Sequence, residues 1–199
     1  MEANNHKTTG IRFLKHVNVN SLIDRIPDIS WDTDDDFKAN YNKNAEGALR
    51  DTRHSILKFA DKRGDFNRYS ELPAWQQWKQ LLLPIMDDIT SVYGYNQGFY
   101  PKVMFANLPA HSFIAPHIDG DERGHVPHKI HVPLATNDKA SFFLGTEKYH
   151  FDIGDAYEVN NGVRHGVANG GETDRIHLIF EYLDADLQPD YIRAQILAQ

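Results

Sequence analysis

The sequence predicts a mainly β fold, a sandwich or a closed barrel, with supporting helices from its N-terminal half. Two observations lead to this prediction. Seven or eight short strand-like segments separated by turn signals follow Gly98. Before them, the segment from Trp75 to Val92 has the period of a helix. The 199 residues contain no Pro/Gly/Ser-rich linker, so residues 1–199 are expected to form a single domain.

The composition excludes several classes of protein. A hydrophobic fraction of 41% and a mean hydropathy of -0.56, without an apolar run near ~20 residues, argue against a membrane partner. The polar start MEANNHKTTG lacks the apolar core of a secretory signal, and no cysteine is present for disulfides or thiolate metal sites. A net charge of -7 argues against a nucleic-acid partner. We therefore expect a cytoplasmic protein.

Residues 1–99 are expected to supply helices and strands that support the barrel. SLIDRI (21–26) predicts a short helix capped by Ser21, and GALRDTRHSILKF (47–59) predicts one or two strands. A longer helix is expected to begin near Ser70, Glu71 and Pro73 and to stop at Gly94. Its tryptophan stripe is interpreted as core, and Pro84 should bend the helix or divide it in two.

The expected barrel core spans residues 100–184, and a C-terminal helix is expected within 185–199. The predicted strands are YPKVMFANL, FIAPHID, HKIHVPLAT, ASFFLG, KYHFDI, DAYEV, RHGVAN and RIHLIFEYL. Asn and Gly residues in the turns between them tolerate positive φ angles. YIRAQILAQ closes the chain as the expected helix.

The segment from His117 to Leu134 contains enough histidines and acids to suggest a metal site, although it could be only a polar loop. On a strand, residues i and i+2 project from one face, so His117 and Asp119 can reach the same ion. His165, after the Asn-Asn-Gly turn, is the third candidate. Two histidines and one carboxylate leave three octahedral positions open, as non-haem Fe(II) oxygenases require. These three residues are therefore predicted as the metal ligands and catalytic centre.

Arg175 follows His165 at the head of the last predicted strand. A guanidinium buried near a metal needs a carboxylate partner. The distal carboxylate of a metal-chelated keto acid would supply one. Arg175 is therefore predicted to bind a cosubstrate.

Several of these motifs together resemble the aspartyl/asparaginyl β-hydroxylase branch of the Fe(II)/2-oxoglutarate-dependent oxygenases. The motifs are HID, KIHVPLATN, GDAYEVNN, RHGVAN and DRIHLIFEYL, and they cover about residues 100–184 in family order. The resemblance implies a double-stranded β-helix (jelly-roll) barrel. It also implies that Fe(II), 2-oxoglutarate and O2 are the cofactors, with His117, Asp119 and His165 as iron ligands and Arg175 on the 2-oxoglutarate C5 carboxylate.

Two further positions match the cosubstrate site of that family. His131 matches a residue that helps to hold 2-oxoglutarate, and Lys129 stands where many relatives carry arginine. The lysine cannot make the bidentate contact of an arginine, but it leaves a cation on the same strand face as His131.

The remaining histidines are interpreted with simpler alternatives. A second H-x-D triplet, His150 to Asp152, is expected to be structural or exposed. His125 and His128 are expected in a solvated or substrate-side loop rather than in a zinc site. His177 shares a strand face with Arg175, so it either lines the pocket or is a hydrogen-bonded core histidine.

The expected function is a dioxygenase that hydroxylates an amino-acid-type C–H bond. A small molecule or a peptide is the expected partner: a peptidyl Asp or Asn, or a free amino acid such as proline. A metal- or 2-oxoglutarate-binding sensor of cupin-like fold is the main alternative, and a cupin-type isomerase is a lesser one. Strand alternation in 47–59 would place Arg50, Thr52 and His54 on one face, with Arg50 as a possible substrate contact; the simpler interpretation is a surface ion pair.

Overall fold

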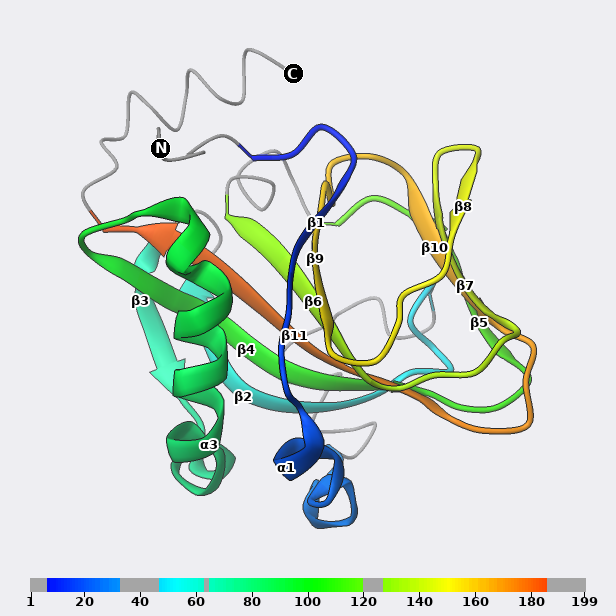
Figure 1. The fold of residues 1–199 in the computed structure, drawn as a ribbon, viewed down its shortest axis with the longest axis horizontal. Coiled ribbons are helices and arrows are strands. Elements are labelled where there is room, and N and C mark those ends of the chain that lie inside the picture. The colour runs from blue at the N-terminus through cyan, green and yellow to red at the C-terminus, as the bar shows by residue number, and fades with distance from the viewer. Residues whose placement is uncertain (1–6, 33–46, 63–64, 120–126, 186–199) are drawn as a thin grey trace.

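The computed structural model describes residues 7–32, 47–62, 65–119 and 127–185, which form two antiparallel β-sheets and two α-helices (Figure 1). The seven-stranded sheet has the order β1-β9-β6-β11-β4-β2-β3, and the four-stranded sheet has the order β5-β10-β7-β8. The strands are β1 (Ile11–His16), β2 (Arg53–Lys62), β3 (Asp65–Glu71), β4 (Gly98–Leu108), β5 (Ser112–His117), β6 (His128–Ala135), β7 (Ala140–Leu144), β8 (Glu147–Tyr149), β9 (Asp155–Val159), β10 (His165–Asn169) and β11 (Arg175–Asp184). The α-helices are α1 (Asn20–Ile23) and α3 (Pro73–Thr90).

From β4 onward the chain passes back and forth between the two sheets, except that the hairpin of β7 and β8 stays in the smaller one. Strands β4, β6, β9 and β11 lie in the larger sheet, while β5, β7, β8 and β10 lie in the smaller one. This alternation is what a double-stranded β-helix requires, and the predicted jelly-roll fold is confirmed. The eight strands span residues 98–184, close to the expected core of 100–184.

Two hydrophobic cores lie on opposite faces of the larger sheet. On the outer face, α1 and α3 cover the sheet, and Figure 1 shows both helices on that side. There Trp78 of α3 packs edge-on against Phe105 of β4, with ring centroids 4.8 Å apart. Between the sheets, side chains such as Leu108, Phe142 and Val167 form the second core. The amphipathic period of the tryptophan helix therefore serves packing, as predicted.

The N-terminal elements differ in detail from the sequence predictions. Helix α1 begins at Asn20 after Val19, so the predicted Ser21 cap is wrong. Helix α3 begins at Pro73, since Ser70 still belongs to β3, and it continues through Pro84 without being divided. A short 3-10 turn follows α3, and Gly94 ends it with a φ of 65°, as predicted from the sequence.

The strand predicted to span 47–59 begins only at Arg53, because residues before it form turns. The strand alternation that grouped Arg50 and Thr52 with His54 is therefore wrong. The expected helix within 185–199 lies outside the described residues except for Ala185.

Candidate metal centre

The smaller sheet brings together the two histidines of the predicted triad. His117 is the last residue of β5 and His165 is the first residue of β10, and they are partners across the antiparallel ladder. Asp119 lies two residues beyond β5, where its backbone N–H donates to the carbonyl of Asn161 at 3.2 Å. One ligand atom from each of the three side chains lies within 4.8 Å of the other two. Within the described parts of the chain, this is the only such group of potential ligands.

Backbone carbonyls orient both imidazoles toward a common point. Nδ1 of His117 is 2.9 Å from the carbonyl oxygen of Ala115, and Nδ1 of His165 is 2.9 Å from that of Val163. A proton on each Nδ1 leaves each Nε2 free to bind a metal, which is the usual second-shell arrangement for histidine ligands. The two Nε2 atoms lie 3.4 and 3.8 Å from Oδ1 of Asp119. The chemistry of this donor set fits a divalent ion such as Fe(II) with open positions.

The protonation states of His165 and Asp119 also suit metal binding, whereas the hydrogen bond to Asp119 raises the pKa of His117. Burial lowers the pKa of His165 to about 4, so its imidazole is neutral at neutral pH. Burial alone would raise the pKa of Asp119, but Lys129 and His117 outweigh it and hold that pKa well below its usual value. Neutral imidazole and ionised carboxylate are the forms that coordinate metals.

Lys129 lies on β6 and forms an ion pair with Oδ2 of Asp119. The Nε2 atoms of His117 and His165 lie nearest to the other oxygen, Oδ1. One oxygen of Asp119 therefore faces the histidines and the other faces the lysine. Lys129 therefore neutralises the carboxylate from the sheet side in this structure. Its predicted contact with a cosubstrate stays a prediction.

Arg175 is a buried cation without an anionic partner among the residues that the structure describes. Arg175 is the first residue of β11 and is only 5% exposed. No described carboxylate lies within 4 Å of its guanidinium. One guanidinium nitrogen instead lies 3.3 Å from Nδ1 of His177. Burial lowers the pKa of Arg175 to about 9. An unpaired buried charge costs several kcal/mol, which makes this position suited to an anionic ligand.

Two neighbouring imidazoles carry buried nitrogens that have no hydrogen-bond partner among the described residues. They are Nδ1 of His131 and Nε2 of His177, and the two rings meet edge to face with centroids 5.8 Å apart. Burial holds the pKa of both histidines well below the usual value. Together with Arg175, these unpaired polar groups fit a bound molecule that carries carboxylates.

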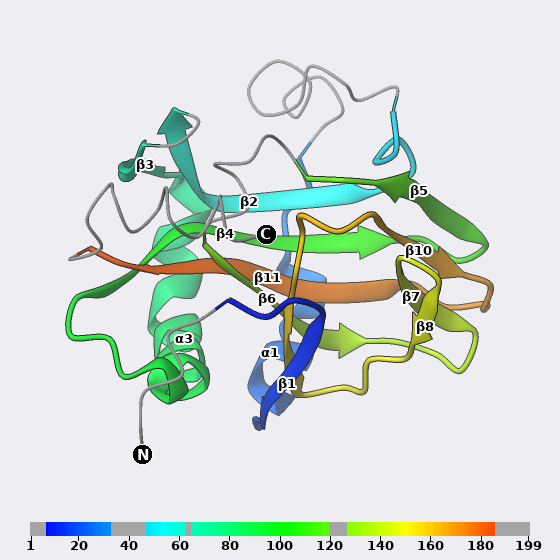
Figure 2. The ribbon, with the colours of Figure 1, turned by 90° about the horizontal axis from the view of Figure 1, so that it is seen from above.

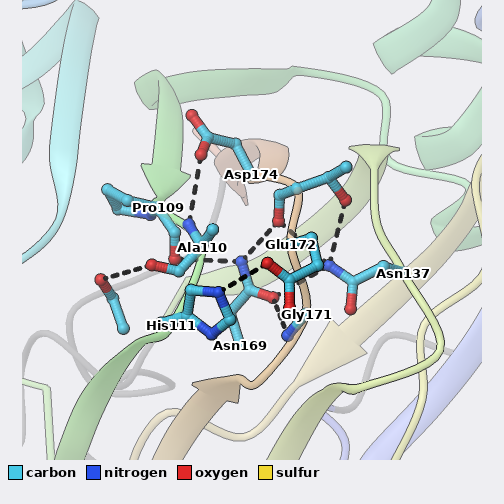
Figure 3. A network of polar contacts seen from close by, with 10 residues as sticks. Pro109, Ala110, His111, Asn137, Asn169, Gly171, Glu172 and Asp174 are labelled. Atoms are coloured by element: carbon cyan, nitrogen blue, oxygen red, sulfur yellow. Dashed lines mark hydrogen bonds and ion pairs between the residues drawn. The ribbon is translucent and has the colours of Figure 1, made fainter.

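A network of amide side chains joins the strand that carries His165 to the strand that carries Arg175 (Figure 3). Asn169, at the end of β10, is 1% exposed, and its Nδ2 lies within 2.9–3.1 Å of the carbonyl oxygens of Leu108, Pro109 and Thr173, to which its two hydrogens can be donated. Asn137 donates to Oδ1 of Asn169 at 2.9 Å. The network therefore fixes the turn between the third metal ligand and the buried arginine.

The other predicted positions lie elsewhere. The guanidinium of Arg50 is 3.1 Å from Asp51 and its side chain is 68% exposed, which favours the surface interpretation; a substrate contact stays a prediction. His150 and Asp152 lie apart from the triad, and the Asp152 side chain is 74% exposed. His125 lies outside the described residues.

The prediction for His128 is wrong, because this residue begins β6 and is 3% exposed. Its Nδ1 is 2.7 Å from Glu158, and its Nε2 is 2.7 Å from the hydroxyl of Tyr95. Glu158 also pairs with Arg12 and accepts a hydrogen bond from Tyr93 at 3.1 Å. This buried network was not predicted from the sequence, where its only signal is Glu158 inside the strand segment DAYEV.

Comparison with known families identifies the chain. Residues 44–184, more than half of the sequence, match the aspartyl/asparaginyl beta-hydroxylase family. The chain belongs to this family. The expectation of a 2-oxoglutarate-dependent hydroxylase that uses Fe(II) and O2 is thereby confirmed, and the His-Asp-His triad agrees with it. No match was found among curated proteins.

Solved structures share the fold of this hydroxylase-family chain at low sequence identity. A 2OG-Fe(II) oxygenase family protein from Burkholderia pseudomallei is 15% identical, with a TM-score of 0.59, over 87% of this chain and 84% of that one. HygX from Streptomyces hygroscopicus, solved with nickel, 2-oxoglutarate and hygromycin B, is 15% identical, with a TM-score of 0.51, over 91% of this chain and 85% of that one. No helix within the described residues has the length and apolar character that a membrane crossing needs.

Proposed function

We propose that this chain hydroxylates a C–H bond of an amino-acid-type substrate, with His117, Asp119 and His165 as the Fe(II) ligands and Arg175 as the anchor of 2-oxoglutarate. The substrate is either a peptidyl Asp or Asn or a free amino acid such as proline. The observation that carries the proposal is the buried Arg175 guanidinium, which lies on the same sheet face as His131 and has no carboxylate partner in the described parts of the chain. A keto acid would supply the missing anion.

Each residue has a role that follows from its surroundings. When bound, Fe(II) with 2-oxoglutarate and O2 supplies the oxidising power that an unactivated C–H bond needs. His117 and His165 present Nε2 because backbone carbonyls hold their Nδ1 protons. Arg175 binds the distal carboxylate with a charge-assisted pair, and the unpaired nitrogens of His131 and His177 can hydrogen-bond to the same molecule.

Aromatic side chains exclude water around these groups. Phe142 stacks on His165 with ring centroids 5.8 Å apart, and Phe151 stacks on Phe142 at 5.1 Å. The low polarity of this wall strengthens the electrostatic contacts inside it. It also limits side reactions of the activated centre with solvent.

The proposal is tested by measuring succinate formation from 2-oxoglutarate. Succinate formation should require Fe(II) and O2, and His165→Ala should abolish it while the thermal unfolding midpoint of the metal-free protein stays close to that of the parent. Binding of Fe(II) and 2-oxoglutarate without any succinate formation, across capped Asp and Asn peptides and free amino acids, would instead support the sensor.

A further inference from the structure

Three charged side chains form a row across the inner face of the larger sheet, the face toward the metal centre. Lys129 of β6 stands opposite Glu181 of β11, and Glu181 stands opposite Lys102 of β4. Opposite residues on antiparallel strands lie only about 4.5–5.5 Å apart. Lys129 in turn pairs with Asp119. The charges therefore alternate in sign from the metal ligand Asp119 across three neighbouring strands.

The next row along the strands combines His131 with two apolar residues, and Arg175 lies further along β11. Strands β2, β4, β11 and β6 run side by side in Figure 2. The next row along them contains His131, Ile179 and Met104, which are partners in the ladders. Arg175 lies on the same face of β11 but at its opposite end from Glu181. The charged row thus lies away from the proposed 2-oxoglutarate anchor.

Glu181 and Lys102 form an ion pair without a hydrogen bond between them. Nζ of Lys102 is 3.8 Å from Oε1 of Glu181, beyond hydrogen-bond distance. Glu181 is 9% exposed, yet no described residue donates a hydrogen bond to its carboxylate. Lys102 keeps 24% of its side chain exposed, and its ammonium lies 5.3 Å from the Phe59 ring centroid. The Glu181 carboxylate oxygens are not among the fully buried polar atoms that lack a partner, and the pair has no hydrogen bond of its own, so a polar ligand can add hydrogen bonds to both charges.

Lys7, a lysine close to this row, already donates a hydrogen bond. Nζ of Lys7 donates to Oδ1 of Asn161 at 2.5 Å, while Lys129 is engaged by Asp119. Glu181 and Lys102 are therefore the charges of the row with hydrogen-bonding capacity left among the described residues. Glu181 can accept hydrogen bonds from a cationic group, and Lys102 can donate them to an anionic group.

We propose that Glu181 binds the α-ammonium group and Lys102 the α-carboxylate of a free α-amino acid, the substrate of the hydroxylation. This inference rests on the proposed function. The side chain of the amino acid would then extend along Ile179 and Met104 toward the metal centre. A residue inside a peptide offers neutral amides at both positions, so it would desolvate the Glu181–Lys102 pair without giving either charge a new charge-assisted contact. The neighbouring opposite charges of Glu181 and Lys102 therefore favour a zwitterion over an internal peptide residue.

The test uses the protein loaded with Ni2+ in place of Fe(II) and with 2-oxoglutarate. Each of the proteinogenic amino acids is titrated by calorimetry, both free and as its N-acetyl amide. At least one free amino acid should bind, and its capped form should bind about ten-fold or more weakly. The same free amino acid should stimulate succinate formation by the Fe(II) protein.

Two variants examine the recognition residues. Glu181→Gln and Lys102→Met should each weaken amino-acid binding by about ten-fold or more and leave the affinity for 2-oxoglutarate within about two-fold. The matched controls are Glu147→Gln and Lys148→Met, which change exposed residues of β8 and should leave both affinities unchanged. Circular dichroism of the near-isosteric Glu181→Gln separates recognition from misfolding.

Three results would overturn the inference: capped amino acids binding as well as free ones, no free amino acid binding at all, or both variants binding like the parent. A parent protein that binds metal but not 2-oxoglutarate would instead reject the proposed function. The two failures are therefore distinguishable.

Discussion

His165, the first residue of β10, stands directly opposite His117, the last residue of β5, across an antiparallel ladder with ring centroids 4.5 Å apart. Pairing of these two strands therefore creates two of the three metal ligands at once. A register irregularity follows between His165 and Val167. Because opposite residues share a face, a slip of one residue would turn one imidazole away from the other.

Replacing His117 or His165 by Ala should remove metal binding and leave the fold largely intact. The triad lies at strand ends at the edge of the core, so removal of one ligand should lower the metal affinity much more than the stability of the fold. Calorimetric titration with Fe(II) under anaerobic conditions measures the loss. Asp152→Ala is the control, since its carboxylate is exposed and away from the triad. Loss of metal binding in Asp152→Ala would mean that the wrong H-x-D triplet was chosen.

Gly166→Ala should weaken metal binding because a Cβ at this position would lie 2.9 Å from the carbonyl oxygen of Ile114 and 3.3 Å from the nitrogen of Pro116. Both atoms belong to the backbone of β5, which must move and carry His117 with it. We expect a loss of about 1–3 kcal/mol in the free energy of unfolding.

Gly170→Ala is the matched control, because its added Cβ would meet its nearest atom at an ordinary distance of 3.6 Å. Thermal unfolding and metal titration of both variants check the prediction. Equal behaviour of the two variants would show that the spacing between β5 and β10 does not set the metal site.

Arg175→Met should weaken 2-oxoglutarate binding by about 1.5–3 kcal/mol, the range for hydrogen bonds to charged groups. Lysine at this position should restore only part of the affinity, because it lacks the planar pair of donors. Calorimetry with an inert divalent metal measures binding independently of turnover. An unchanged affinity in Arg175→Met would remove this residue from the cosubstrate site.

Glu158→Gln should destabilise the protein by about 1.5–3 kcal/mol, because it removes a fully buried carboxylate that pairs with Arg12 and hydrogen-bonds to His128. Burial would raise the pKa of Glu158, but His128 and Arg12 outweigh it and lower this pKa below the ordinary 4.5. The ionised carboxylate thus contributes stability above pH 4.5, and this contribution is lost as the pH falls through the lower folded-state pKa.

Urea unfolding at pH values from neutral to about 3.5 should therefore show a weaker acid dependence in Glu158→Gln than in the parent. Glu147→Gln, on an exposed strand, serves as the control. An acid dependence identical in parent and Glu158→Gln would contradict a role for this carboxylate in stability.

Much of the fold and the triad could be predicted from the sequence, because both leave local signals. The strand segments after Gly98 and the helix around Trp78 follow periods of two and 3.6 residues, which depend only on near neighbours in the chain. His117 and Asp119 were found from their spacing, and His165 and Arg175 from their places at the heads of strands β10 and β11.

Only the tertiary structure decided which charged residues are buried and what they face. The burial of His128 could not be predicted from the sequence, because it comes from Glu158 and Tyr95 of distant segments. The row of Lys129, Glu181 and Lys102 likewise depends on the registers of three strands that are far apart in the chain. A local period determines on which face of its own strand a side chain lies, whereas its neighbours across the sheet depend on strand pairing, which no local pattern contains.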